Sequence, residues 1–169
     1  MEIALFEEVW AAGYHFDSIT WTDDLGYKNG MLFSPKTYRE LVAPVHKRAV
    51  DWAHSKGAKV RCHSCGNINA VLADLVEIGI DLIHPLEVKA GMDPLKVKSD
   101  YGNRLAIHGG LNAMLWNDLD AITAEIERLV PLLMQSGGYI FAADHSIPND
   151  VSFENMKAII ELAKRVGRY

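Results

Sequence analysis

Two side chains that could bind a metal, His63 and Cys65, stand at the end of a short apolar run that begins at Lys59. The run follows a glycine that closes a helical segment, and it ends in Gly66-Asn67, so it is typical of a buried strand. Because side chains alternate between the two faces of a strand, these two point to the same side. Imidazole nitrogen and thiolate sulfur suit zinc better than calcium or magnesium. Ordinary packing of a buried histidine and cysteine is the alternative explanation.

The two cysteines of the chain, Cys62 and Cys65, are also spaced as in a redox Cys-x-x-Cys motif. That motif works at the N-terminus of a helix, whereas the strand predicted here turns Cys62 away from Cys65. Their closeness on one strand makes a structural disulfide unfavourable, and a reducing compartment keeps both as thiols. These two arguments disfavour redox chemistry and leave ordinary packing and metal binding as the interpretations of this strand end.

Other polar side chains follow the remaining predicted strands, each at the C-terminal end: Asp23, Asp24, Glu87, His108 and His145. In a β/α barrel these ends converge on one mouth, where such enzymes have their active sites. Alternation lets one aspartate face the mouth, and we predict Asp24 in a substrate-binding or supporting role, with a solvated loop or helix cap as the alternative. His108 precedes two glycines, where backbone can approach a ligand closely, so we predict a ligand contact there. We expect His84, which precedes Pro85, to be structural.

The elements that position these side chains alternate along the chain. Apolar residues at helical spacing predict helices over residues 2–13, 35–56, 67–78, 93–101, 118–136 and 153–166, and short apolar runs predict strands over residues 16–22, 59–67, 80–87, 105–110 and 139–145. Such alternation indicates parallel β/α units with right-handed crossovers. Five units are fewer than the eight of a complete barrel. We therefore predict an α/β fold in which residues 1–169 form a single domain, the second part of a TIM-type (β/α) barrel, with an open doubly wound sheet as the alternative.

Composition limits the class of partner. The 169 residues are 49% hydrophobic and 23% charged, which is typical of a globular domain, and the formal net charge is −5. This charge argues against a general nucleic-acid or membrane surface and favours small molecules or proteins as partners. With neither a membrane-length apolar run nor a signal-like N-terminus, we expect a cytoplasmic protein. An incomplete barrel exposes strand edges and apolar surface, so we expect a homo-oligomer or pairing with an N-terminal half-barrel.

The order and spacing of several motifs resemble the C-terminal part of the uroporphyrinogen decarboxylase superfamily, and more closely its zinc-dependent, corrinoid-linked methyltransferase branch. The resemblance covers essentially the whole chain and implies a β/α barrel with its site at the C-terminal mouth. The matching motifs are Thr22-Asp23-Asp24-Leu25-Gly26, Ser34-Pro35 with the following helix, His63-Ser64-Cys65-Gly66-Asn67, Gly79-Ile80-Asp81, His108-Gly109-Gly110-Leu111-Asn112 and Ala143-Asp144-His145-Ser146-Ile147-Pro148.

In that branch the His-x-Cys-Gly-Asn motif supplies two zinc ligands, and a cysteine after the last strand supplies a third. His145 holds that last position here. The resemblance thus implies a zinc site of His63, Cys65 and His145 with an open fourth position, which Glu87 would fill or guard. It further implies activation of a thiol substrate for methyl transfer, with a corrinoid carried by a partner protein.

The decarboxylase branch offers a second interpretation, because a histidine in the last loop also occurs there, without a metal. A porphyrinogen substrate needs cations for its carboxylates, and the arginine-rich segment that supplies them in that branch has no counterpart here. Arg61 and Arg104 do not replace it. Three interpretations therefore stay open: a zinc-dependent methyltransferase, a decarboxylase of a tetrapyrrole or other carboxylated substrate, and a non-catalytic truncated barrel that needs a partner half.

Overall fold

The computed structural model of the protein describes residues 3–168. Its main sheet has five parallel strands, and their spatial order β1-β4-β5-β6-β7 follows the order of the chain. The strands are β1 (Ser18–Thr22), β4 (Lys59–His63), β5 (Leu82–His84), β6 (Ala106–His108) and β7 (Tyr139–Ile140). A doubly wound sheet would reverse direction along this order, whereas consecutive barrel units do not. The predicted α/β fold and partial barrel are confirmed.

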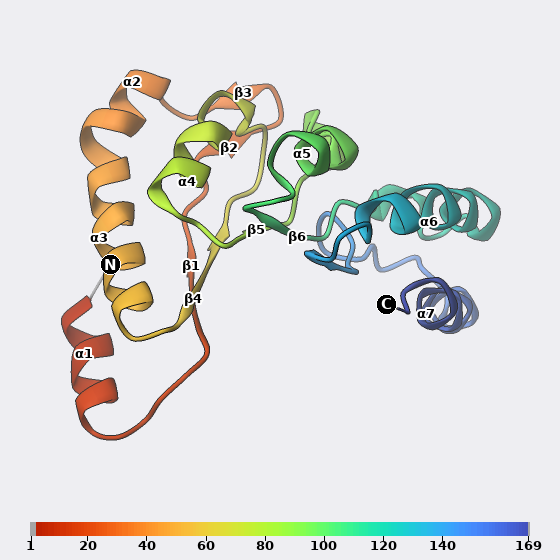
Figure 1. Ribbon diagram of the computed structural model, residues 1–169. Helices are drawn as coiled ribbons and strands as arrows, with labels where there is room; N and C mark the ends of the chain where they lie inside the picture. Colours follow the sequence, from red (N-terminus) through yellow and green to blue (C-terminus); the bar gives the residue numbers. More distant parts are fainter. Residues whose placement is uncertain (1–2, 169) are drawn as a thin grey trace.

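Helices follow the strands in an arc along one face of the sheet and leave the opposite face open (Figure 1). They are α1 (Ile3–Ala11), α2 (Pro35–Thr37), α3 (Ala43–Ser55), α4 (Leu72–Ile78), α5 (Pro94–Tyr101), α6 (Leu119–Leu133) and α7 (Phe153–Val166). Single turns of 3₁₀-helix cover Asn69–Val71, Val88–Ala90 and Ala113–Leu115. None of the helices in residues 3–168 has the length and apolar composition needed to cross a membrane.

The long helix predicted after Ser34 is interrupted by a π-helical turn. The Ser34 side chain accepts a hydrogen bond from the backbone N–H of Thr37, which is the predicted N-cap. A π-helical turn, Tyr38–Val42, then precedes α3. Pro44, at the start of α3, has no N–H to continue the regular α-helical pattern, which accounts for the irregularity just before it.

Two segments differ from the predicted elements. The polar loop after β1 contains a small antiparallel hairpin, β2 (Gly26–Tyr27) with β3 (Gly30–Met31). The fifth strand was predicted over residues 139–145 but is only two residues long, and a single bridge between Leu111 and Ala143 continues its pairing. Beyond this bridge, the side chain of Asp144 accepts hydrogen bonds from the loops after β5 and β6.

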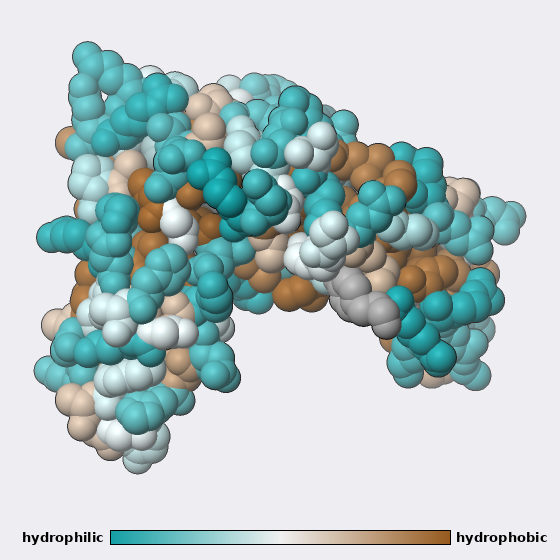
Figure 2. All heavy atoms as spheres, in the orientation of Figure 1, coloured by the Kyte–Doolittle hydropathy of each residue, from teal (hydrophilic) through white to brown (hydrophobic). Residues whose placement is uncertain are grey.

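The two faces of the sheet differ in composition. On the face toward the helices, Cys62, Ile83 and Ile107 lie side by side on three adjacent strands and are at most 1% exposed. Together with apolar residues from the helices they form the core. The opposite face, called the inner face below, carries half-buried polar side chains. Figure 2 shows the same arched outline, with hydrophobic atoms visible along its underside.

Candidate metal centre

Strand β4 presents His63 on the inner face, and Cys65 follows two residues later. Burial alternates along the strand, because Val60 and Cys62 enter the core while Arg61 and His63 are half-buried on the other side. The Sγ of Cys65 lies 3.4 Å from Nε2 of His63, so the two side chains meet on one side of the strand. Cys62 and Cys65 point to opposite sides and are free thiols. This placement argues against the redox motif.

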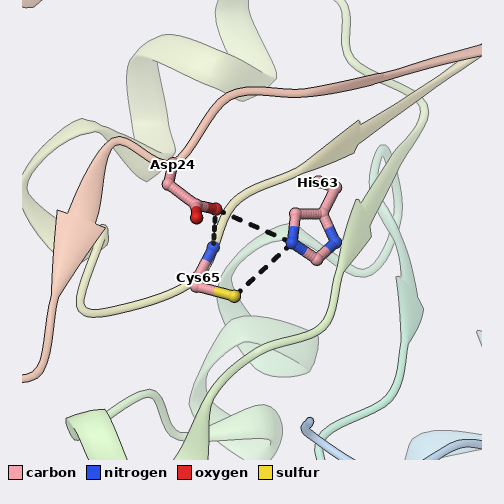
Figure 3. A group of neighbouring side chains, drawn as sticks. All are labelled: Asp24, His63 and Cys65. Carbon is pink, nitrogen blue, oxygen red and sulfur yellow. Dashed lines mark hydrogen bonds and ion pairs between the residues drawn. The ribbon is translucent and has the colours of Figure 1, made fainter. Parts of the chain in front are cut away.

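Asp24 joins this pair from the loop after β1 (Figure 3). Its Oδ1 accepts a hydrogen bond of 2.9 Å from the backbone N–H of Cys65 and lies 3.6 Å from Nε2 of His63. The three potential ligand atoms all lie within 4.8 Å of one another. Asp23 faces the other way, with Oδ2 2.9 Å from Nε2 of His46. Alternation therefore directs Asp24, and not Asp23, toward the mouth.

Close contact between two loops sets the position of Asp24. Gly66 has a φ of +80°, and a Cβ there would lie 2.3 Å from the carbonyl carbon of Gly26. Only glycine permits both the left-handed conformation and this approach of the two backbones. The buried hydroxyl of Ser64 accepts a hydrogen bond of 3.0 Å from the backbone N–H of Leu25. These contacts tie the loop after β1 to the end of β4.

The distances suit a tetrahedral zinc ion. Two atoms that share such an ion lie roughly 3.4–3.6 Å apart, because Zn–N and Zn–O bonds are about 2.0–2.2 Å and Zn–S bonds about 2.3 Å. The distances of 3.4 Å and 3.6 Å from Nε2 of His63 to its two neighbours match this range. One nitrogen, one sulfur and one oxygen donor also leave a fourth position open, as in catalytic zinc sites.

The electrostatics of the cluster favour a cation. Burial, followed by the carboxylates of Asp24 and Glu87, raises the pKa of the Cys65 thiol to about 11. A thiol with this pKa is protonated at neutral pH. A bound cation would offset the negative charge of its neighbours and would deprotonate the thiol. Binding of a metal here is thus coupled to release of a proton.

Glu87 lies beside the cluster and supports the Cys65 loop. Its Oε2 accepts a hydrogen bond of 2.7 Å from the backbone N–H of Gly66, and its Oε1 lies 3.4 Å from the Lys89 ammonium. Within residues 3–168, the cluster of potential ligands contains Asp24, His63 and Cys65 but not Glu87. A fourth-ligand or guarding role for Glu87 stays a prediction, and the structure adds a contact that positions Cys65.

His84, which we expected to be structural, orients His63. Nδ1 of His84 lies 2.7 Å from Nδ1 of His63, while Nε2 of His63 faces Cys65 and Asp24. A histidine that binds a metal through one nitrogen commonly donates its other N–H to a fixed acceptor. Burial, and then the neighbouring His108, His63 and Arg61, lower the pKa of His84 to about 4, so at neutral pH it is uncharged and able to accept.

A row of imidazoles continues from His84 to the next strand. The ring centroids of His84 and His108 are 4.6 Å apart, and Nδ1 of His108 lies 3.4 Å from Nη1 of Arg61. Burial and Arg61 lower the pKa of His108. The sequence contains a signal for this row, since β4, β5 and β6 each end in histidine at neighbouring register positions. Comparing the strand ends position by position would have identified His84.

In the last loop the aspartate is buried and the histidine is exposed. Asp144 is fully buried and accepts hydrogen bonds of 2.8 Å from the backbone N–H groups of Val88 and Ala113. His145 is exposed, and the ligand cluster in residues 3–168 has Asp24 in the third position. The structure therefore does not bring His145 to His63 and Cys65, and its role as a ligand stays a prediction. Asp144 is the residue that sequence reasoning missed, and it connects the loops after three strands.

A known protein family matches most of this chain. The sequence profile of the family described as uroporphyrinogen decarboxylase (URO-D) matches residues 9–166. The uroporphyrinogen decarboxylase of Pelodictyon phaeoclathratiforme is 27% identical over 139 residues, which cover 78% of this chain and 38% of that protein. The methylcobamide:CoM methyltransferase MtaA of Methanosarcina barkeri is 26% identical over 132 residues, which cover 76% of this chain and 36% of that protein.

A solved structure shows the same fold. The methyltransferase from Methanosarcina mazei aligns with a TM-score of 0.67 at 23% identity, over 90% of this chain and 43% of that one. At this identity the likeness extends to the fold alone. The chain spans about two fifths of the length of these relatives.

Proposed function

This chain belongs to the uroporphyrinogen decarboxylase (URO-D) family, and from that premise we propose that it carries the zinc site of a methyltransferase. The enzyme would transfer a methyl group between a corrinoid protein and a thiol or another small molecule. The observation that carries the proposal is the donor set of Asp24, His63 and Cys65, whose ligand atoms lie within 4.8 Å of one another. The relative that is 26% identical to this chain and is named a methylcobamide:CoM methyltransferase also supports the proposal.

Each side chain has a distinct task in this proposal. His63 and Cys65 hold the metal, with Asp24 as third ligand, and His145 is the alternative third ligand that would require its loop to turn inward. Zinc, when bound, supplies Lewis acidity that favours the thiolate form of a thiol substrate. His84 fixes the ring of His63 through the 2.7 Å contact between their Nδ1 atoms.

The substrate side of the site is formed by residues on the inner face of the sheet. Glu87 holds the Cys65 loop by accepting a hydrogen bond from the backbone N–H of Gly66, and in this proposal it would fill or guard the fourth position. His108, half-buried at the end of β6, is placed to contact the substrate. Neither residue needs to change its charge for these tasks.

A decarboxylase is the second candidate, and the names of relatives such as the 27% identical uroporphyrinogen decarboxylase favour it. Such an enzyme would act on a tetrapyrrole or another carboxylated substrate and would need no metal. The two candidates differ in a measurable property, because chelation of zinc would abolish methyl transfer and leave decarboxylation unchanged.

Metal content provides the test. The protein is purified without added metal and its zinc is measured by elemental analysis, together with Cys65→Ser and the matched control Cys62→Ala. We expect about one zinc per chain in the wild type and in Cys62→Ala, because Cys62 lies in the core, and near-complete loss in Cys65→Ser. A wild-type protein that holds no zinc at micromolar supply would rule out the methyltransferase proposal.

Completion of the barrel is part of the same proposal. The five strands leave β1 and β7 at the two edges of the sheet and leave the inner face open. Large apolar side chains near the β7 end are exposed, namely Ile140, Ile147 and Phe153. We propose that a second copy or a separate N-terminal half-barrel covers these surfaces.

Light scattering of this chain should give a mass above that of the monomer, and a stable monomer that binds no dye for apolar surface would contradict the proposal. The non-catalytic interpretation predicts assembly without zinc.

A further inference from the structure

Arg61 differs from the other arginines of the chain. The other six, Arg39, Arg48, Arg104, Arg128, Arg165 and Arg168, are all exposed, and three of them pair with carboxylates. Arg61 is half-buried, and within residues 3–168 no carboxylate lies within salt-bridge distance of it. Its Nε atom is buried without a hydrogen-bond partner in the described structure. A half-buried guanidinium without a counter-ion is costly and calls for an explanation.

The position of Arg61 relates it to the metal centre. Arg61 and His63 are two residues apart on β4, so their side chains leave the same face of the sheet about 7 Å apart. The guanidinium extends across the sheet toward β6, where Nη1 lies 3.4 Å from Nδ1 of His108. Arg61 therefore lies on the inner face, beneath the proposed site and within reach of a ligand bound there.

The hydrogen bonds define what Arg61 and His108 can bind. A guanidinium only donates hydrogen bonds, so Nδ1 of His108 accepts and the ring carries its proton on Nε2. The pair then offers several N–H donors, one positive charge and no free acceptor. A planar fork of N–H groups matches the oxygens of a carboxylate, sulfonate or phosphate. A ligand group without acceptor atoms would leave these donors unsatisfied, and a neutral acceptor would leave the positive charge uncompensated.

We propose that Arg61 and His108 form an anion subsite that binds the acidic end of a small-molecule substrate, whose other end reaches His63 and Cys65. The separation along β4 suits a short substrate, in which a few bonds lie between the acidic group and the reacting atom. The subsite determines substrate specificity and does not require zinc, so it can be tested apart from the metal. It rests on the proposed function and deepens it by naming the residues of this chain that would hold the acidic group of the substrate.

Titration with three probes tests the subsite. The metal-free full chain is titrated with ethanesulfonate, propionate and inorganic phosphate, and the imidazole NMR signals of His108 are followed. We expect the chemical shifts of His108 to change saturably with probe concentration, and the probe that binds most tightly identifies the acidic group. Arg61→Met should lower the affinity for that probe roughly tenfold or more. Arg61→Lys, which keeps the charge but not the fork, should show intermediate binding and provides a second measurement should Arg61→Met fail to fold.

Two controls separate this result from the metal proposal. Arg104→Met removes a cation that is exposed and paired with Glu77, and it should leave binding unchanged. Cys65→Ser should lose zinc but keep anion binding, so failure of the metal site would not imitate failure of the subsite. The inference is overturned if none of the probes binds, if Arg61→Met and Arg104→Met weaken binding equally, or if binding requires zinc and disappears in Cys65→Ser.

Discussion

The two faces of the sheet use similar residue types in different ways. On the face toward the helices, His46 is 1% exposed and both ring nitrogens have partners, the Tyr38 hydroxyl at 3.3 Å and Asp23 at 2.9 Å. On the inner face, His63, His84, His108 and Arg61 are half-buried, and their contacts join His63 to His84 and Arg61 to His108. Interior polar groups with complete partners stabilise a fold, whereas incompletely paired groups are available for ligands. The face toward the helices, called the outer face below, therefore stabilises the fold, whereas the inner face carries the groups available for ligands.

The two cysteines make the same contrast. Burial, and then the Asp23 carboxylate, raises the pKa of Cys62 to about 12, and this fully buried thiol lies in the apolar core. Cys65, three residues later, owes its raised pKa to burial together with the carboxylates of Asp24 and Glu87. The first thiol is closed off from solvent, whereas the second is partly exposed beside two further potential metal ligands, Asp24 and His63. Similar pKa values therefore reflect different surroundings.

The largest effect should come from opening a cavity on the outer face. Ile107 is fully buried between β5 and the helices, so Ile107→Ala should lower the free energy of unfolding by about 2–5 kcal/mol. His108→Ala, the next residue but on the inner face, should cost about 1 kcal/mol or less. Urea denaturation followed by circular dichroism measures both. Equal losses would break the assignment of stability to the outer face.

The second effect concerns zinc affinity. His84→Gln removes the imidazole that orients His63 and should weaken zinc binding by about 10–100-fold with little loss of stability. Competition with a chromophoric chelator gives the affinity. His54→Gln is the matched control, because this histidine also has a close partner, Asp81 at 2.7 Å, but lies away from the cluster. Unchanged affinity in His84→Gln would show that His63 needs no support.

A smaller effect should appear as pH dependence of stability. The pKa of His84 is about 4 in the folded chain, below its ordinary value of 6.5, mainly because of burial. Between pH 6.5 and 4 the unfolded chain binds a proton that the folded chain does not, so stability falls as the pH decreases through this window. Because His84 is partly exposed, we expect a loss on the order of 1–2 kcal/mol in metal-free protein. His84→Gln should flatten the profile, and an unchanged profile would argue that this imidazole is well solvated.

The smallest effect is expected at the surface. Arg39 donates two hydrogen bonds, of 2.8 and 3.0 Å, to the carboxylate of Asp74, and its side chain is 55% exposed. Arg39→Gln should lower stability by about 0.2–1 kcal/mol, and less at high salt. Thermal denaturation at two ionic strengths measures this loss. A cost comparable to that of Ile107→Ala would mean that the outer helices depend on charge more than on packing.

Sequence reasoning predicted most of the framework because its signals are local. The last helix was predicted over residues 153–166 and has those bounds, since an apolar stripe and the N-cap Ser152 are both encoded within a few residues. The strand-end position of His63 and Cys65, and the inward direction of Asp24, follow from alternation along single strands. The family motifs led us to expect zinc, and the same motifs predicted the β/α barrel fold.

The parts that local signals did not determine depend on contacts between strands. The position of His84 before Pro85 predicts a structural residue, and its contact with His63 follows only from the register between two strands. The roles of Arg61 and Asp144 likewise follow from distant partners, His108 in one case and two loop amides in the other. The role of His145 as a ligand stays a prediction from its place in a motif, and within residues 3–168 it lies outside the cluster of Asp24, His63 and Cys65.

The amino-acid sequence by itself determined the order of β/α units, the face on which each strand residue lies and the pairing of a histidine with a cysteine. Tertiary structure alone decided which groups from other segments surround that pair. Asp24 lies beside the Cys65 thiol and His84 lies beside His63, while Arg61 has no carboxylate partner within residues 3–168. The physical reason is distance along the chain. Periodicity acts over a few residues, whereas pairing, burial and charge balance are set by loops and strands that are brought together only when the sheet forms.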